Sequence, residues 1–240
     1  LVECNPVEGV INNLASLKNG TDLANEYGCE QFIFISSDKA VRPLGVMGAT
    51  KRMGELYVQS MNSRSRGSFF AVRFGNVIGS SGSLIPYVVK RIQEGEPVQL
   101  THREMTRYFM LIPEAVSLIL QSCLHAKGGE IFILDMGKPV KIYDLVKDLI
   151  LLLERQPGKD VPIDFIGLRP GEKMHEELFI EGFERLQQLD GFFVNTSPAP
   201  DFDEMRRLLE GILNAGQEER VDHMLASLHC VVSSGIKMVS

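Results

Sequence analysis

The chain has 240 residues, of which 44% are hydrophobic and 23% are charged, an ordinary balance for a soluble globular protein. The net charge of −6 and the lack of a Lys/Arg run argue against a general nucleic-acid binder. No apolar run approaches the ~20 residues of a membrane span, and the scattered cysteines and histidines predict free thiols and no metal site.

The predicted elements alternate between helices and strands. The first helix is expected after Asn5-Pro6, because proline suits the first turn of a helix, and it ends near Gly28. Apolar runs predict strands at 32–35, 68–74, 97–100, 130–135 and 162–168. Helical spacing predicts helices at 49–62, 84–94, 113–128, 142–154, 202–215 and 217–228, and residues 191–200 are expected to form a loop. This alternation favours an α/β fold with a parallel sheet.

The segment 31–51, QFIFISSDKAVRPLGVMGATK, carries the first candidate site. Its apolar strand stops at a polar cluster, and ligands bind at the carboxyl ends of strands in open α/β sheets. The following helix places Met47 and Lys51 on one face. A Ser/Tyr/Lys oxidoreductase has tyrosine where Met47 stands, and a thioether cannot transfer a proton. Taken alone, this pair is a very weak signal for a catalytic site, and a helix surface with a packed methionine is the favoured interpretation.

Five motifs in one order carry a resemblance to a known family. They are SSDKAVRPLGVMGATKRMGE, VRFGNVIGSSGSLIP, TRYFMLIPEA, FILDMGKPVKI and GLRPGEKMHEEL. Between Asn5 and about Phe179 the sequence resembles the extended short-chain dehydrogenases/reductases. Within them it is similar to the bacterial UDP-N-acetylglucosamine 4,6-dehydratase and capsular polysaccharide biosynthesis branch.

The resemblance implies a partial Rossmann-like parallel sheet with a smaller C-terminal α/β substrate-binding lobe. The expected domains are 1–80 for the cofactor-binding part with the catalytic strand, 81–190 for the substrate lobe, interleaved with the last Rossmann elements, and 191–240 for a C-terminal loop and helices. No G-x-G-x-x-G loop occurs in the chain. The N-terminal cofactor-binding half is therefore expected to be missing, and these residues alone to bind cofactor weakly and to lack activity.

The resemblance also assigns catalytic roles. Ser37 corresponds to a hydroxyl that hydrogen-bonds the sugar C4 oxygen, Asp38 to the acid that protonates the departing C6 hydroxyl, and Lys39 to the base for the C5 proton. Lys51 corresponds to the lysine that contacts the nicotinamide ribose. Met47 occupies the tyrosine position, as it does in one subgroup of these dehydratases, which leaves Lys51 or Lys39 to remove the C4 hydroxyl proton.

The remaining assignments concern ligand binding. The cofactor, NAD or NADP, is expected at Ser36, Lys51, Phe74, Gly75 and Val77. The UDP-sugar is expected at Asn76, Arg107, Arg169 and Glu172. Two guanidinium groups suit a pyrophosphate, which they bind in bidentate fashion. The segment 79–83, GSSGS, is either a phosphate cradle or a turn that shapes the pocket. Asn13 is expected to brace the active-site backbone.

The function implied is a UDP-N-acetylhexosamine 4,6-dehydratase, an NAD(P)-dependent lyase of surface glycan synthesis. The alternatives are a UDP-sugar 4-epimerase on the same scaffold and a truncated, non-catalytic nucleotide-sugar-binding module. Asp38 and Lys39 favour the dehydratase. We expect a cytoplasmic homo-oligomer without a nucleic-acid partner, attached to the inner membrane only if upstream segments provide an anchor.

Overall fold

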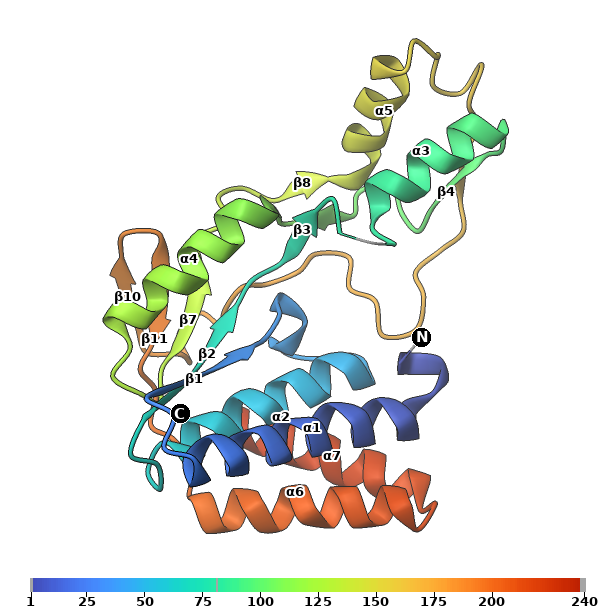
Figure 1. Cartoon of the computed structure of the whole chain (residues 1–240). Coiled ribbons are helices and arrows are strands. Elements are labelled where there is room, and N and C mark those ends of the chain that lie inside the picture. The colour runs from blue at the N-terminus through green and yellow to red at the C-terminus, as the bar shows by residue number, and fades with distance from the viewer. Residues whose placement is uncertain (1, 81, 238–240) are drawn as a thin grey trace. The chain divides into compact units, whose positions relative to one another are not determined.

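The computed structural model describes residues 2–80 and 82–237 (Figure 1). The helices are α1 (Pro6–Glu26), α2 (Val46–Met61), α3 (Leu84–Glu94), α4 (Ile112–His125), α5 (Ile142–Leu152), α6 (Phe202–Gln217) and α7 (Val221–Lys237). The strands are β1 (Gln31–Ile35), β2 (Ser68–Arg73), β3 (Asn76–Ile78), β4 (Val98–Leu100), β5 (Thr106–Arg107), β6 (Phe109–Leu111), β7 (Ile131–Leu134), β8 (Val140–Lys141), β9 (Ile163–Phe165), β10 (Leu186–Leu189) and β11 (Phe192–Asn195).

The chain forms two compact units. Unit 1 contains residues 1–74, 118–135 and 177–240, and unit 2 contains residues 75–117 and 136–176. These boundaries differ from the expected divisions at 80 and 190. The reason is that unit 2 is built from two separate excursions of the chain, while the C-terminal helices pack into unit 1.

A five-stranded sheet forms the centre of unit 1. Its order is β1-β2-β7-β11-β10. Strands β1, β2 and β7 are parallel to one another, and β11 pairs antiparallel with both of its neighbours, β7 and β10. Phe69, Phe70 and Phe132 are completely or almost completely buried within it. The α/β class and the parallel arrangement predicted from the sequence are confirmed.

The expected loop at 191–200 is wrong in its first half. Phe192–Asn195 forms β11, which pairs with both β10 and β7. Gly191 closes the tight turn of the hairpin with φ of +77°, a conformation that glycine adopts without strain. Asp190-Gly191 followed by aromatic and β-branched residues is itself a hairpin signal.

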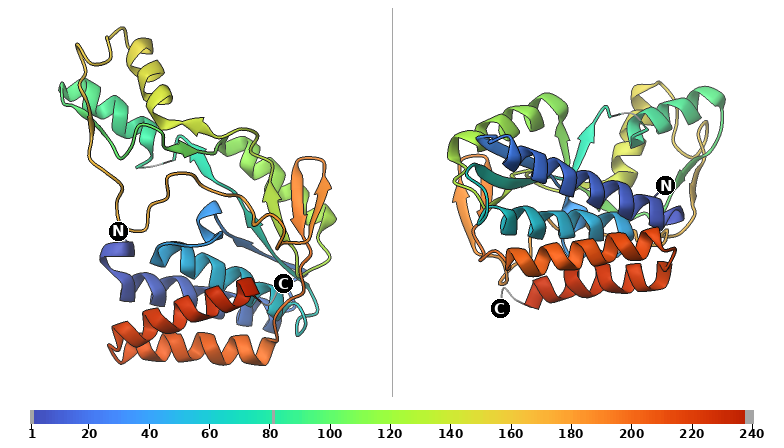
Figure 2. Two further views of the ribbon diagram at one scale, coloured as in Figure 1. Left: turned by 180° about the vertical axis from the view of Figure 1, so that it is seen from behind. Right: turned by 60° about the horizontal axis from the view of Figure 1, so that its bottom comes forward.

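Helices cover one face of this sheet in two layers. Figures 1 and 2 show α1 and α2 next to the strands, with α6 and α7 beyond them. The buried side chains of this four-helix layer include Leu14, Leu17, Met53, Tyr57, Met205, Leu209, Ile212, Met224 and Leu228. Because α2 is buried along nearly its whole length, the helix that carries Met47 and Lys51 is held rigidly.

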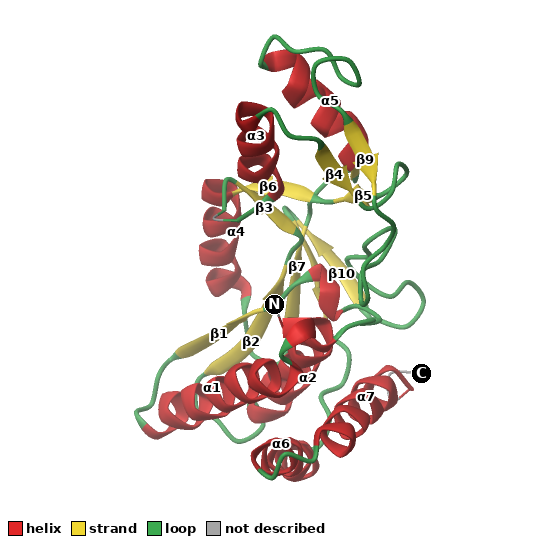
Figure 3. Ribbon diagram, turned by 90° about the vertical axis from the view of Figure 1, so that its right-hand side faces the viewer, coloured by secondary structure: helices red, strands yellow, loops and turns green. Residues whose placement is uncertain are grey.

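Unit 2 is smaller and combines helices with short ladders. The pairs β3–β6 and β4–β9 are parallel, and β5–β8 is antiparallel (Figure 3). Its core consists of Val88, Val98, Leu100, Met105, Ile142, Val146, Ile150 and Val161. Among the described residues of both units, no helix combines the length and the apolar character that crossing a bilayer requires.

Candidate active site and substrate pocket

Ser37, Asp38 and Lys39 form one hydrogen-bonded group where β1 ends. Asp38 is completely buried, and its Oδ1 accepts from the Ser37 hydroxyl at 2.8 Å and from Lys39 Nζ at 3.0 Å. Its other oxygen, Oδ2, is buried and has no hydrogen-bond partner within the described residues. A buried carboxyl oxygen without a partner is costly, so an unoccupied acceptor of this kind often marks a functional site.

The backbone of this group is fixed by the neighbouring strand. The amide of Ser36 donates to the Val72 carbonyl at 2.8 Å, and the amide of Asp38 donates to the Phe74 carbonyl at 3.0 Å. The Ser36 hydroxyl donates to Glu55 at 2.7 Å inside the protein. The hydroxyl and the backbone amide of Ser36 are therefore both occupied by protein partners.

The start of α2 is held in place by side chains outside the helix. The Glu3 carboxylate accepts from the amides of Val46 and Met47 at 2.9 and 3.1 Å and thereby caps the helix. Asn13 donates to the Thr50 hydroxyl at 2.9 Å, which in turn donates to the Met47 carbonyl at 2.8 Å. Asn13 is thus linked to the backbone of Met47 through the Thr50 hydroxyl, an arrangement that could brace this part of the backbone.

Lys51 directs its ammonium group at the same strand end. Its Nζ donates to the Ile35 carbonyl at 2.9 Å and lies 5.1 Å from the centre of the Phe34 ring. Burial lowers the pKa of Lys51 below its usual value, and the nearby carboxylate of Glu55 partly opposes this shift. An ammonium group has three N–H donors, so Lys51 retains donors for a ligand hydroxyl.

This lowered pKa predicts a pH dependence of stability. Between the folded and the unfolded pKa of Lys51 the unfolded chain binds the extra proton, so this residue makes the free energy of unfolding rise with pH. We expect wild type to gain stability relative to Lys51→Met as pH rises through that window, measured by urea denaturation. An NMR titration that puts the Lys51 pKa at or above the ordinary value of about 10.4 would contradict the prediction.

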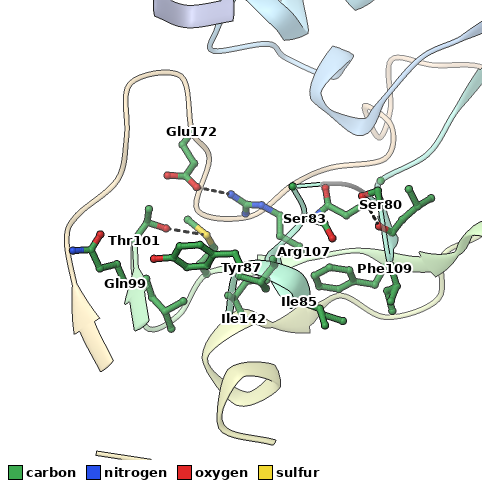
Figure 4. A pocket seen from close by; sticks show the side chains of 18 of the residues that line it. Ser80, Ser83, Ile85, Tyr87, Gln99, Thr101, Arg107, Phe109, Ile142 and Glu172 are labelled. Carbon is green, nitrogen blue, oxygen red and sulfur yellow. Dashed lines mark hydrogen bonds and ion pairs between the residues drawn. The ribbon is translucent and has the colours of Figure 1, made fainter. Parts of the chain in front are cut away.

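A pocket of about 660 Å³ lies within unit 2 (Figure 4). The residues predicted to bind the UDP-sugar all line it, namely Asn76, Arg107, Arg169 and Glu172. Gly75 and Val77, predicted to bind cofactor, line the same pocket. These residues come from three separate segments of the chain and contribute to one cavity, whose volume suits a small-molecule ligand.

Arg107 is the buried member of this group. Its guanidinium donates to the carbonyls of Thr106 at 2.7 Å, Lys173 at 2.9 Å and Met174 at 3.2 Å. It also lies 3.5 Å from the Glu172 carboxylate, toward which it points in Figure 4. These bonds hold the 172–174 segment against β5, so Arg107 has a structural role in addition to the predicted ligand contact.

Arg169 is exposed and differs from Arg107 in this respect. Within the described residues its guanidinium makes no hydrogen bond or ion pair, whereas its backbone amide donates to Glu172 at 3.1 Å. A guanidinium that lines a pocket without a protein partner keeps all five donors for a ligand. Of the two arginines, Arg169 is the better placed to bind an anion.

The sequence reasoning missed several lining residues. Tyr87, Gln99, Thr101 and His102 also face the pocket. Gln99 could have been found, because it alternates with the buried Val98 and Leu100 along β4.

The glycine-rich segment leads into the first turn of α3. Ser83 immediately precedes this helix and lines the pocket, and its buried hydroxyl has no hydrogen-bond partner within the described residues. The N-terminus of a helix attracts anions, because its first amides are unpaired. Ser81, part of the predicted 79–83 cradle, lies outside the described residues.

The predicted site residues are divided between the two units. Ser36, Ser37, Asp38, Lys39, Met47, Lys51 and Phe74 belong to unit 1, and Gly75, Asn76, Val77, Arg107, Arg169 and Glu172 belong to unit 2. Each unit therefore carries a different kind of chemistry. Unit 1 has the hydrogen-bonded Ser37, Asp38 and Lys39 at a strand end, and unit 2 has the pocket lined by two arginines.

Comparisons with known proteins agree on a family. The model of the family described as polysaccharide biosynthesis protein matches residues 1–196. The capsular polysaccharide biosynthesis protein CapD of Staphylococcus aureus is 55% identical over 179 residues, which cover 74% of this chain and 30% of that protein. A UDP-N-acetylglucosamine 4,6-dehydratase (inverting) of Campylobacter jejuni is 34% identical over 180 residues, which cover 73% of this chain and 51% of that protein.

A solved structure extends the comparison to the fold. The X-ray structure of Pen from Bacillus thuringiensis superposes with a TM-score of 0.75 at 33% identity, covering 83% of this chain and 61% of that one. The chain thus spans between about a third and three fifths of these proteins. It belongs to the polysaccharide biosynthesis protein family, a branch of the extended short-chain dehydrogenases/reductases that includes nucleotide-sugar dehydratases.

Proposed function

We propose that this chain supplies the acid–base group and the nucleotide pocket of a UDP-N-acetylhexosamine 4,6-dehydratase. The observation that carries the proposal is the fully buried Asp38 carboxyl, which is paired with Lys39 and has one oxygen without a partner. An elimination needs one acid and one base side by side, and these two groups lie 3.0 Å apart.

The roles follow from the chemistry of each group. The proton of Lys39 Nζ that faces Asp38 first moves to the carboxylate along their hydrogen bond. The neutral Lys39 then accepts the proton from sugar C5, and the protonated Asp38 gives its proton to the C6 oxygen, which leaves as water, so the ion pair is restored. Ser37 orients the C4 oxygen by a hydrogen bond. Met47 has no proton to transfer, so the C4 hydroxyl proton goes to a lysine, either Lys51 or Lys39.

A nicotinamide cofactor fits the residues of unit 1 in part. Lys51 has donors left for a ribose hydroxyl, and the backbone at Ser36 and Phe74 borders the strand end. When bound, NAD or NADP would accept the hydride from sugar C4 and later donate it to C6. The cofactor would therefore be regenerated in its oxidised form in each turnover. The chain has no glycine-rich loop for the cofactor pyrophosphate.

The pocket of unit 2 suits a nucleoside diphosphate. Arg169 offers an unpaired guanidinium, and the N-terminus of α3 adds partial positive charge. Glu172 supplies a carboxylate that can accept from ribose hydroxyls. Because two guanidinium groups and one carboxylate line this cavity, a pyrophosphate bearing a hydroxylated sugar is the ligand we infer.

A product assay tests the function. The full-length protein that the gene encodes is incubated with UDP-N-acetylglucosamine and NAD(P)⁺, and the masses of the products are measured by mass spectrometry. We expect a 4-keto-6-deoxy product that is lighter than the substrate by one water. A 4-epimerase would leave the mass unchanged, and UDP binding without any turnover would identify a non-catalytic binding module.

A further inference from the structure

A buried ionic cluster lies directly behind the proposed catalytic group in unit 1. At its centre is Arg73, the last residue of β2, whose side chain is completely buried. All five N–H donors of its guanidinium are used: two donate to Glu55 at 2.8 and 2.7 Å, two to Glu184 at 3.3 and 3.1 Å, and one to the Leu178 carbonyl at 2.9 Å. No donor of Arg73 is left for solvent or for a ligand.

The carboxylates of Glu55 and Glu184 each accept two further hydrogen bonds besides those from Arg73. Glu55 also accepts from the Ser36 hydroxyl at 2.7 Å and from Arg52 at 2.9 Å. Glu184 also accepts from the Asn195 amide and from the backbone amide of Ile180, at 3.0 and 2.9 Å. Burial tends to raise the pKa of Glu55, but Arg73 and Arg52 outweigh it and hold this pKa below the usual value. The carboxylate therefore stays ionised, and two arginines balance two glutamates.

The cluster contacts each element that carries a proposed catalytic residue. Ser36 follows β1 directly and precedes Ser37, and Glu55 lies one helical turn after Lys51 on α2. Phe74, the neighbour of Arg73, accepts the backbone hydrogen bond of Asp38. The other side of the cluster is the segment 178–184, which includes no predicted site residue.

Stability alone does not explain such an arrangement. Moving charges out of water costs free energy, and an apolar cluster of the same volume is often as stable as a buried ion pair. What a fully bonded ionic cluster adds is directionality, because each carboxylate oxygen of Glu55 and Glu184 accepts from two donors.

We propose that Glu184 is a positioning residue, which acts through Arg73 and Glu55 to hold the strand end with Ser37, Asp38 and Lys39 in its productive geometry. The expected effect of Glu184 on turnover rests on the proposed function, whereas its expected effect on the backbone at 36–41 does not. Glu184 contacts none of the proposed reacting groups. Its effect on them is exerted through two intermediate side chains.

The test is Glu184→Gln, which keeps the shape of the side chain but replaces one acceptor that faces Arg73 by a donor. We expect the backbone amides of 36–41 to exchange hydrogen about 10-fold faster, measured by hydrogen–deuterium exchange under conditions in which the protein is fully folded. We also expect kcat for UDP-N-acetylglucosamine to fall about 10- to 100-fold with little change in KM, as for a small misplacement of catalytic groups. UDP affinity, a property of the pocket in unit 2, should stay unchanged.

Glu181→Gln is the matched control, because Glu181 is exposed on the same segment, and it should alter none of these readings. If Glu184→Gln does not fold, Ser36→Ala takes its place, because it removes only the hydrogen bond from Ser36 to Glu55. The same changes in hydrogen exchange and kcat are then expected. A lower melting temperature with unchanged exchange at 36–41 and unchanged kcat would overturn the proposal. If wild type has no turnover, the proposed function fails, but the exchange measurement still decides the positioning role.

Discussion

Replacing Asp38 with Asn is expected to lower the turnover of UDP-N-acetylglucosamine by about 10²- to 10⁴-fold, the range that general acid–base catalysis contributes. The amide has the same size and can still accept from Ser37 and Lys39, so the fold should persist. It cannot give a proton to the departing C6 hydroxyl. Initial rates of 4-keto product formation measure the loss, and Lys39→Ala should cause a similar loss by removing the base.

UDP affinity separates this chemical effect from a loss of binding. The pocket proposed to bind the nucleotide belongs to unit 2, so calorimetric titration with UDP should give nearly the wild-type affinity for both variants. Asp190→Asn is the control, since Asp190 is exposed in the β10–β11 turn of unit 1, the unit that also contains Asp38 and Lys39. Wild-type turnover in either Asp38→Asn or Lys39→Ala would show that the assigned roles are wrong.

The sequence predicts those helices and strands whose apolar residues recur at a regular spacing. The bounds of α1, α2, α3 and α5 agree with the helical spacing within a few residues, because their apolar faces pack on a core. The β10–β11 hairpin was missed, since Leu186–Leu189 has only two apolar residues and its partner strand is four residues long. Strands of this length have too few residues for alternation to become visible.

The ionic cluster has no sequence signal at all. Glu55, Arg73 and Glu184 are far apart in the chain, and charged residues are usually exposed, so each taken alone indicates a surface position. Their burial depends on mutual pairing, which only the folded chain brings about. The position of Ser37, Asp38 and Lys39 was easier to predict, because these residues are neighbours in sequence and follow a recognisable strand.

The two arginines of the nucleotide pocket should respond differently to removal. Arg169→Ala is expected to weaken UDP binding by about 10- to 100-fold, the loss of one or two charge-assisted hydrogen bonds. Its guanidinium has no protein partner within the described residues, so the melting temperature should stay the same. Arg107→Ala should weaken binding and also lower the melting temperature, because the carbonyls of Lys173 and Met174 lose their donor inside the protein.

Arg155→Ala is the matched control for both variants, since Arg155 is exposed in unit 2 and does not line the pocket. Calorimetric titration with UDP at two salt concentrations makes the comparison sharper. Exposed charges are screened by salt, so the effect of Arg169 should shrink at high ionic strength, and that of the buried Arg107 should persist. Unchanged UDP affinity in Arg169→Ala would mean that the diphosphate is not bound by this guanidinium. The buried Arg107 and the N-terminus of α3 would then be left as the anion-binding groups of the pocket.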